Sequence, residues 1–316
     1  MIRFEEVSES DAQTTYPVKN IIWSGKTAAC NSVVFAESDA YGRMLFLDGE
    51  LQSASTDERI YHESLVHPVL VATADTPLKR VLVIGGGEGA TVREVIRWGH
   101  ASVAEVVWVD IDTELVELCR DHLGWAPHVY DNPRVRFIGK DIREVLPDPS
   151  IGKFDVIILD LPDPDGDTGY LYSPEFWIAI KKALVRDGRI VSHVGPVRPM
   201  GRIGEGLQRV WSGVRESDLD STPLVAGFYS IVIPSFQGSW GFWMTGYPMT
   251  RMDSVIIPSS LSVVDREQLT QWAYPPLMWR RALSAQVVDA LAFGVCRTYE
   301  TPIPTCNCSV TYSDGE

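Results

Sequence analysis

The chain has 316 residues, with 28 basic and 42 acidic side chains and a formal net charge of −14. Hydrophobic residues make up 45% of the chain and charged residues 22%, a balance typical of a folded globule rather than a disordered chain. The acidic excess argues against nucleic-acid binding, which depends on Lys and Arg at the phosphates, and is compatible with a cationic substrate.

Three features of the sequence bear on location and metal content. No apolar run approaches the roughly 18 residues of a membrane span, and the first ten residues lack the pattern of a signal peptide. The five cysteines are an odd and sparse set, which favours a reducing compartment and predicts a cytoplasmic protein. The six histidines show no paired-ligand spacing, so we expect no metal site.

The first part of the chain is predicted to be a small β region. Segments 31–38, 43–49 and 50–55 have the composition of strands, and Asp48-Gly49 is a strong hairpin signal between the last two. Residues 60–72 then have apolar side chains spaced for one face of a helix. The segment 73–80 is a plausible domain boundary.

From about residue 80 to 200 the pattern alternates between strand and helix. Strands are predicted at 81–86, 105–112, 135–141 and 188–195, and segment 154–164 is predicted to be a strand that runs into a proline-rich loop. Helices are predicted at 90–99, 113–124, 142–147 and 173–188, the last with Ser173 as its N-cap. Such alternation predicts an α/β fold with a parallel sheet covered by helices on both faces.

The last third of the chain is predicted to add a helix at 203–217 and an antiparallel strand pair, 224–235 and 238–247, at the sheet edge. A final helix is predicted at 277–293. The expected domains are an N-terminal β-strand domain over 1–72, a catalytic domain over 73–298 and an irregular tail over 299–316.

A glycine-rich turn, GGGEG, follows the first strand of the alternating region and precedes a helix. Gly85 and Gly87 let the backbone approach a ligand closely and present amides at a helix start. The next strand ends in Asp110, and an acid at that position can hydrogen-bond a ribose diol. The competing interpretation, that Asp110 and Asp112 only cap the following helix, is weaker because the two features occur in the expected order.

Acidic residues also follow the next two strands. Asp141 and Ile142 come after the third strand, where they could meet an adenine amino group and base face, although Asp141 could also cap a helix. Asp160 and Asp163 follow the fourth strand on a loop stiffened by prolines. Two such carboxylates would bind a cation, and one could accept its proton.

Several motifs occur together in one order: YGRMLFLDGELQSASTDERIYHE, VLVIGGGEGATVREV, VDID, KFDVIILDLPDP, LYSPEFW and VIPSFQGSWGF. Through them the chain, over about residues 30–295, resembles the aminopropyltransferases of the spermidine and spermine synthase family, and within it the thermospermine synthase branch. The resemblance implies a Rossmann-like sheet of the methyltransferase type behind a small N-terminal β domain. It also implies transfer of an aminopropyl group from decarboxylated S-adenosylmethionine to a polyamine, with methylthioadenosine released.

The resemblance further implies roles for individual residues. Asp160 would be the general base, with Tyr61, His62, Asp163 and Phe236 around the acceptor amine. The donor would be held by residues from both domains: Asn31, Gln52, Gly85, Gly87, Glu88, Asp110, Ile111, Asp141 and Ile142. Relatives form dimers or tetramers, so a homodimer or homotetramer is expected.

Glu88 bears on the identity of the donor. Ordinary S-adenosylmethionine carries a carboxylate on its tail, which an acid in the glycine loop would disfavour. The decarboxylated form carries only an ammonium there, which Glu88 could pair with.

Departures from the family pattern concern the acceptor end. Phe236 stands where the family usually has Tyr, and Asn31 where many spermidine synthases have Gln. Two other functions therefore stay open at this point: amine N-methylation with ordinary S-adenosylmethionine, and a non-catalytic homologue that serves as a binding subunit.

Overall fold

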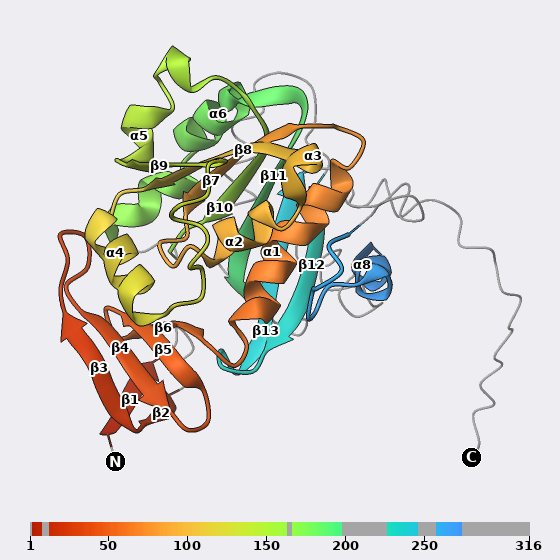
Figure 1. Cartoon of the computed structure of the whole chain (residues 1–316). Helices are drawn as coiled ribbons and strands as arrows, with labels where there is room; N and C mark the ends of the chain where they lie inside the picture. Colours follow the sequence, from red (N-terminus) through yellow and green to blue (C-terminus); the bar gives the residue numbers. More distant parts are fainter. Residues whose placement is uncertain (1, 8–12, 163–165, 198–225, 246–256, 274–316) are drawn as a thin grey trace, which may run out of the picture.

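The computed structural model describes residues 2–7, 13–162, 166–197, 226–245 and 257–273. The predicted helices at 203–217 and 277–293 and the C-terminal tail lie outside these residues. A seven-stranded sheet with helices on both faces forms the main body, and a smaller β region lies beside one end of it (Figure 1). The predicted α/β class is therefore confirmed.

The N-terminal β region contains a hairpin and a four-stranded antiparallel sheet. Its strands are β1 (Ile2–Val7), β2 (Gln13–Val18), β3 (Asn20–Gly25), β4 (Val33–Ser38), β5 (Gly42–Leu47) and β6 (Glu50–Ala54). Strands β4, β5 and β6 confirm the predicted segments, whereas β1, β2 and β3 were not predicted. Asp48 and Gly49 both have positive φ, 49° and 92°, as the tight turn between β5 and β6 requires.

The large sheet has the strand order β12-β13-β11-β10-β7-β8-β9. Its strands are β7 (Lys79–Gly85), β8 (Val103–Asp110), β9 (Val135–Gly139), β10 (Phe154–Asp160), β11 (Leu184–Pro196), β12 (Ala226–Ile233) and β13 (Gly238–Thr245). Strands β7 to β11 run parallel, and β12 and β13 add an antiparallel pair at one edge, as predicted.

The helical elements connect these strands. They are α1 (Glu58–Ala72), α2 (Ala90–Ile96), α3 (Gly99–Ser102), α4 (Thr113–His122), α5 (Ile142–Val145), α6 (Pro174–Ala183) and α8 (Arg266–Ala273), with 3₁₀ turns at Pro149–Ile151 and Gly166–Tyr172. Ser173 caps α6 by accepting from the Phe176 amide at 3.3 Å, as predicted. The predicted helix over 173–188 was too long, because Leu184 already pairs with Phe154 in the sheet.

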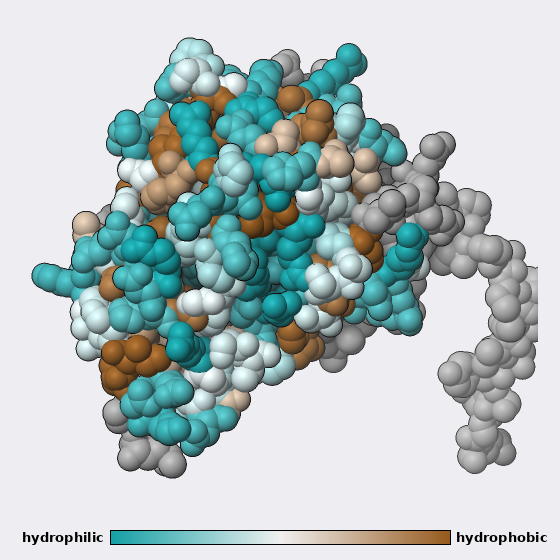
Figure 2. Space-filling view, viewed as in Figure 1, coloured by the Kyte–Doolittle hydropathy of each residue, from teal (hydrophilic) through white to brown (hydrophobic). Residues whose placement is uncertain are grey.

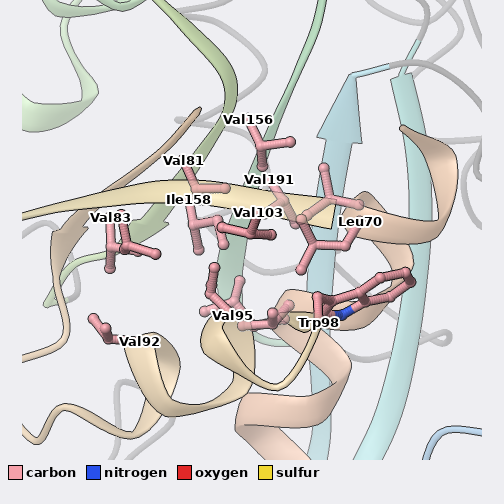
Figure 3. Close-up of a cluster of buried hydrophobic side chains, with 14 of the residues drawn as sticks. Leu70, Val81, Val83, Val92, Val95, Trp98, Val103, Val156, Ile158 and Val191 are labelled. Carbon is pink, nitrogen blue, oxygen red and sulfur yellow. The ribbon is translucent and has the colours of Figure 1, made fainter. Parts of the chain in front are cut away.

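Alternate side chains of the buried strands enter two hydrophobic clusters, one on each face of the sheet. Val81 and Val83 of β7 pack with Val92 and Val95 of α2 and with helix α1 on one face (Figure 3). Leu82 and Ile84 point to the other face, which α5 and α6 cover. Both faces of the central strands β7, β8 and β10 are thus largely buried, whereas the edge strand β9 has no buried residue.

The N-terminal sheet is joined to the main body by helix α4. Leu115 and Cys119 of α4 pack against Val33, Phe35 and Leu45 of the small sheet. The division at residues 72 and 298 stays a prediction. Helix α1 ends at the first of these boundaries and packs against α2 and β11 of the main body.

The surface seen in Figure 2 is mostly hydrophilic, with small hydrophobic patches between the polar groups. Among the described residues, none of the helices has the length and apolar character needed to cross a membrane.

Candidate active site

The carboxyl ends of β7, β8 and β10 meet at one edge of the sheet, where the glycine loop begins. Gly86 donates its amide hydrogen to the main-chain oxygen of Asp160 at 2.8 Å. Gly86 has a φ of +69°, and a Cβ at this position would lie 2.7 Å from Asp160 Oδ2. Only glycine therefore allows the loop to lie this close to the carboxylate.

Two hydroxyl groups hold the Asp160 carboxylate. Tyr61 of α1 donates to Oδ1 at 2.7 Å, and Thr91 of α2 donates to Oδ2 at 2.5 Å. No Lys or Arg of the described residues forms an ion pair with Asp160. A carboxylate has about four lone-pair positions, so Asp160 keeps acceptor capacity for a ligand.

Glu88 lies beside this centre and is held from the small sheet. Ser53 of β6 donates to Glu88 Oε1 at 2.5 Å, and His62 Nε2 lies 3.7 Å from Oε2. Glu88 Oε2 is buried without a hydrogen-bond partner. Burial raises the pKa of Glu88 to about 7, against the opposing influence of His62. The free oxygen suits a cationic ligand group.

His62 carries a positive charge next to Glu88. Its Nδ1 donates to the main-chain oxygen of Glu58 at 2.7 Å and lies 3.0 Å from the Glu58 carboxylate. Burial alone would lower the pKa of His62, but Glu58 outweighs it and raises the pKa to about 9. Arg93 pairs with the same Glu58 carboxylate at 2.8 Å. The charges in this buried group are therefore mutually compensated, and Glu88 Oε2, although it lies near His62, accepts no hydrogen bond.

Asp110 lies on the other side of the glycine loop. A Cβ at Gly87 would lie 3.3 Å from Asp110 Oδ2, so the loop also packs against this side chain. Asp110 Oδ1 accepts from the Asp112 amide at 2.8 Å, and burial raises the pKa of Asp110 to about 7. Asp112, rather than Asp110, caps α4 through the Leu115 amide at 3.0 Å.

The segment after Asp110 is tied to the small sheet and also exposes an apolar group. Thr27 donates to the Asp112 carboxylate. Ile111 is 58% exposed and presents an apolar surface that a ligand ring could cover.

Asp141 and Ile142 are engaged within the protein. Asp141 caps α5 through the Arg143 amide at 2.8 Å, and its carboxylate lies 2.5 Å from the Arg143 guanidinium, which lowers the pKa of Asp141. Ile142 is buried in the hydrophobic cluster under α5 and α6. The Arg143 guanidinium lies 3.9 Å from the centre of the Tyr170 ring. The capping interpretation of Asp141 is confirmed, and an adenine contact stays a prediction.

An aromatic group borders Asp160 through Tyr61. The Phe236 ring lies 4.6 Å from Trp240 and 6.4 Å from Tyr61, measured between ring centres. His193 stacks on Trp240 at 6.2 Å, and its Nε2 donates to the main-chain oxygen of Leu161 at 2.5 Å. His193 Nδ1 is buried and has no hydrogen-bond partner among the described residues. The His193 ring also lies 5.9 Å from that of Tyr61, so His193 belongs to this aromatic group.

The other predicted site residues are not brought into this centre by the described contacts. Gln52 donates to the main-chain oxygen of Glu50 on its own strand at 3.3 Å. Asn31 is exposed between β3 and β4. Asp163 lies outside the described residues. Thr91 and Ser53 were missed, because a hydroxyl residue inside a helix or strand carries no sequence signal for such contacts.

Among the described residues, no group of three or more His, Cys, Asp or Glu side chains is placed to hold a metal ion.

A parallel sheet with a glycine loop and half-buried carboxylates at its strand tips is the arrangement in which α/β proteins bind ligands, at the carboxyl edge of the sheet. The family profile described as "Spermine/spermidine synthase domain" matches residues 58–251. The chain therefore belongs to the spermine/spermidine synthase family.

Individual relatives agree with this assignment. The chain is 39% identical over 247 residues to polyamine aminopropyltransferase 2 of Pseudomonas aeruginosa, a match that covers 75% of this chain and 65% of that relative. It is 34% identical over 279 residues to the polyamine aminopropyltransferase of a Synechococcus species, covering 81% and 85% of the two chains. The crystal structure of the spermidine synthase of Thermotoga maritima has the same fold, with a TM-score of 0.76 at 23% identity, over 90% of this chain and 95% of that one.

Proposed function

We propose that this protein, a polyamine aminopropyltransferase by family, transfers a 3-aminopropyl group from decarboxylated S-adenosylmethionine to a linear polyamine. The acceptor nitrogen attacks the carbon beside the sulfonium, the carbon–sulfur bond breaks, and methylthioadenosine leaves with the bonding electrons. The nitrogen loses one proton in the process, and Asp160 accepts it. The acceptor is putrescine or a spermidine-like amine, which is consistent with the thermospermine synthase branch.

The observation that carries this proposal is the way in which the Asp160 carboxylate is held, by two hydroxyl groups. An alkyl amine has a pKa of about 10, so at neutral pH it is mostly protonated and a poor nucleophile. Asp160 is held by two neutral hydroxyls and has no basic partner among the described residues, so it can bind the ammonium and then take its proton. Asp163, three residues further on, is proposed as a second acidic contact.

The donor is proposed to lie along the glycine loop. Asp110 would accept hydrogen bonds from the ribose, Ile111 would cover the base, and Glu88 would pair with the donor ammonium. The unpartnered Oε2 of Glu88 supports this last contact. Gly85, Gly87, Gln52, Asn31, Asp141 and Ile142 complete the proposed donor site. Because the Asp141 carboxylate already pairs with Arg143, Asp141 would contribute to donor binding indirectly, by fixing the conformation of its loop.

The acceptor is proposed to occupy the aromatic side of Asp160, between Tyr61 and Phe236. Phe236 offers no hydroxyl, so the ring would contact the methylene groups of the amine. His62 borders this region but is engaged with Glu58. We also propose a cytoplasmic location, supported by the sparse cysteines, and a homodimer or homotetramer.

The test is turnover with decarboxylated donor and a panel of amines, with products identified by mass spectrometry. Asp160→Asn is expected to reduce turnover about 10²- to 10⁴-fold, the range for a positioned base, and to leave donor binding intact. Asp110→Ala is expected to weaken donor binding instead. Formation of adenosylhomocysteine would indicate methyl transfer, and no product with any amine from protein that binds the donor would overturn the proposal.

A further inference from the structure

Thr91 has no part in the function proposed above, yet its hydroxyl lies 2.5 Å from Asp160 Oδ2. The side chain is fully buried, so it cannot reach a substrate itself. We infer that Thr91 is a positioning residue that fixes the Asp160 carboxylate for proton transfer and couples it to the donor-binding loop. This inference rests on the proposed role of Asp160 as the base.

Rotation of the carboxylate is the degree of freedom that Thr91 controls. The terminal torsion of an Asp side chain is broad, because rotation about an sp³–sp² bond has no sharp minima. Tyr61 holds Oδ1 only, which still allows the group to pivot. A second donor on Oδ2 fixes the plane, so the remaining lone pairs have one direction. Alignment of this kind is worth large factors in rate, since misplacement by about 1 Å costs up to about 10²-fold.

Thr91 is itself rigidly placed. It lies in the first turn of α2, and its neighbours Val92 and Val95 are fully buried in the hydrophobic cluster between α2 and the sheet (Figure 3). A hydroxyl on such a helix has little freedom to follow a moving partner. The carboxylate therefore adjusts to Thr91, and not the reverse.

The same helix carries the donor loop. Gly86 donates its amide to the main-chain oxygen of Asp160 at 2.8 Å, and the loop runs directly into α2. The base is thus linked to the loop at its main chain by Gly86 and at its side chain by Thr91. Loop and base form one unit, so the carboxylate is already oriented when the donor binds.

The decisive variant is Thr91→Val, which keeps the shape of the side chain and removes the hydroxyl. We expect kcat to fall about 10- to 100-fold, from the loss of a charge-assisted hydrogen bond that orients the base. Donor affinity, measured by calorimetry with decarboxylated S-adenosylmethionine, is expected to change by less than about twofold. Thr91→Ser keeps the hydroxyl and should restore kcat to within about threefold of the wild-type value.

Thr73→Val is the matched control. Thr73 is also buried, and its hydroxyl donates to the main-chain oxygen of Val69 at 3.0 Å, away from the site. The two substitutions remove the same group from a buried position, so a comparable drop in melting temperature is expected. Only Thr91→Val should lower kcat. If that variant does not fold, Thr91→Ala removes the hydroxyl without placing a methyl group against the carboxylate.

A double variant separates this inference from the proposed function. In an Asp160→Asn background, Thr91→Val should cause no further loss of turnover, because its effect passes through the carboxylate. Additive losses would overturn the inference, as would a kcat for Thr91→Val within twofold of wild type while Asp160→Asn is severely impaired. If Asp160→Asn itself kept full activity, the proposed function of Asp160 would fail first.

Discussion

Replacement of Glu88 by Gln tests how this protein recognises its donor. The unpartnered Oε2 of Glu88 is proposed to pair with the donor ammonium, and Gln keeps the size of the side chain without its charge. A hydrogen bond to a charged group contributes about 1.5–3 kcal/mol, so the Gln variant should bind the decarboxylated donor about 10- to 100-fold more weakly at pH 8.

The pH dependence provides the sharper test. The pKa of Glu88 is raised to about 7 by burial, and only its ionised form attracts the ammonium. About one tenth of the carboxylates are then ionised at pH 6 and about nine tenths at pH 8. Donor affinity should therefore rise about tenfold from pH 6 to pH 8 through Glu88 alone. His62, with its pKa raised to about 9, stays charged across this range.

Asp110 complicates the measurement, because burial raises its pKa to about 7 as well. Binding of the product methylthioadenosine separates the contribution of Asp110 from that of Glu88, since the product has the ribose but no aminopropyl ammonium. Calorimetry at pH 6, 7 and 8 should show a steeper pH dependence for the donor than for methylthioadenosine in the wild type. In the Glu88→Gln variant, the affinities for the donor and for methylthioadenosine should depend on pH to the same extent. Equal slopes already in the wild type would refute the assignment of Glu88 to the ammonium.

Two further substitutions test the residues that surround Glu88. Ser53→Ala removes the hydroxyl at 2.5 Å from Glu88 Oε1 and should raise the KM of the donor about 3- to 10-fold with kcat nearly unchanged, whereas the exposed Ser55→Ala should change neither. A fall in kcat alone would contradict this role of Ser53. His62→Gln tests the buried ion pair with Glu58. Because the folded pKa of His62 lies above its ordinary value, the pair stabilises the fold fully below pH about 6.5, and this contribution is lost as pH rises through about 9. The difference in melting temperature between wild type and variant should thus be larger at pH 6 than at pH 9.5, and a constant difference would show that His62 does not titrate as described.

Much of the fold could be predicted from local pattern. The strand tips at Asp110 and Asp160, the turn at Asp48-Gly49 and the cap at Ser173 each depend on residues close in sequence. Such features follow from hydrophobic periodicity and turn chemistry, which act over a few residues. Helix α6 shows where this fails, because its end at Ala183 is set by the pairing of Leu184 with Phe154, thirty positions away.

The contacts that orient the site could not be predicted in the same way. Thr91 lies 69 positions from Asp160, and Ser53 lies 35 positions from Glu88. Neither residue type indicates chemistry by itself, since Ser and Thr hydroxyls most often bond to the main chain or to water. Their function arises only when helix α2 and strand β6 are placed against the strand tips.

The two ends of the site differ for this reason. Four of the residues proposed for the donor end, Gly85, Gly87, Glu88 and Asp110, lie in one short segment formed by β7, the glycine loop, α2 and β8. The proposed acceptor end combines Tyr61 of α1, His193 of β11 and the turn at Phe236, which are brought together by the pairing of β13 with β11. A change in that pairing would alter the acceptor end without touching the glycine loop. With these proposed assignments, amine selectivity can diverge within this fold while the proposed donor site and Asp160 are kept.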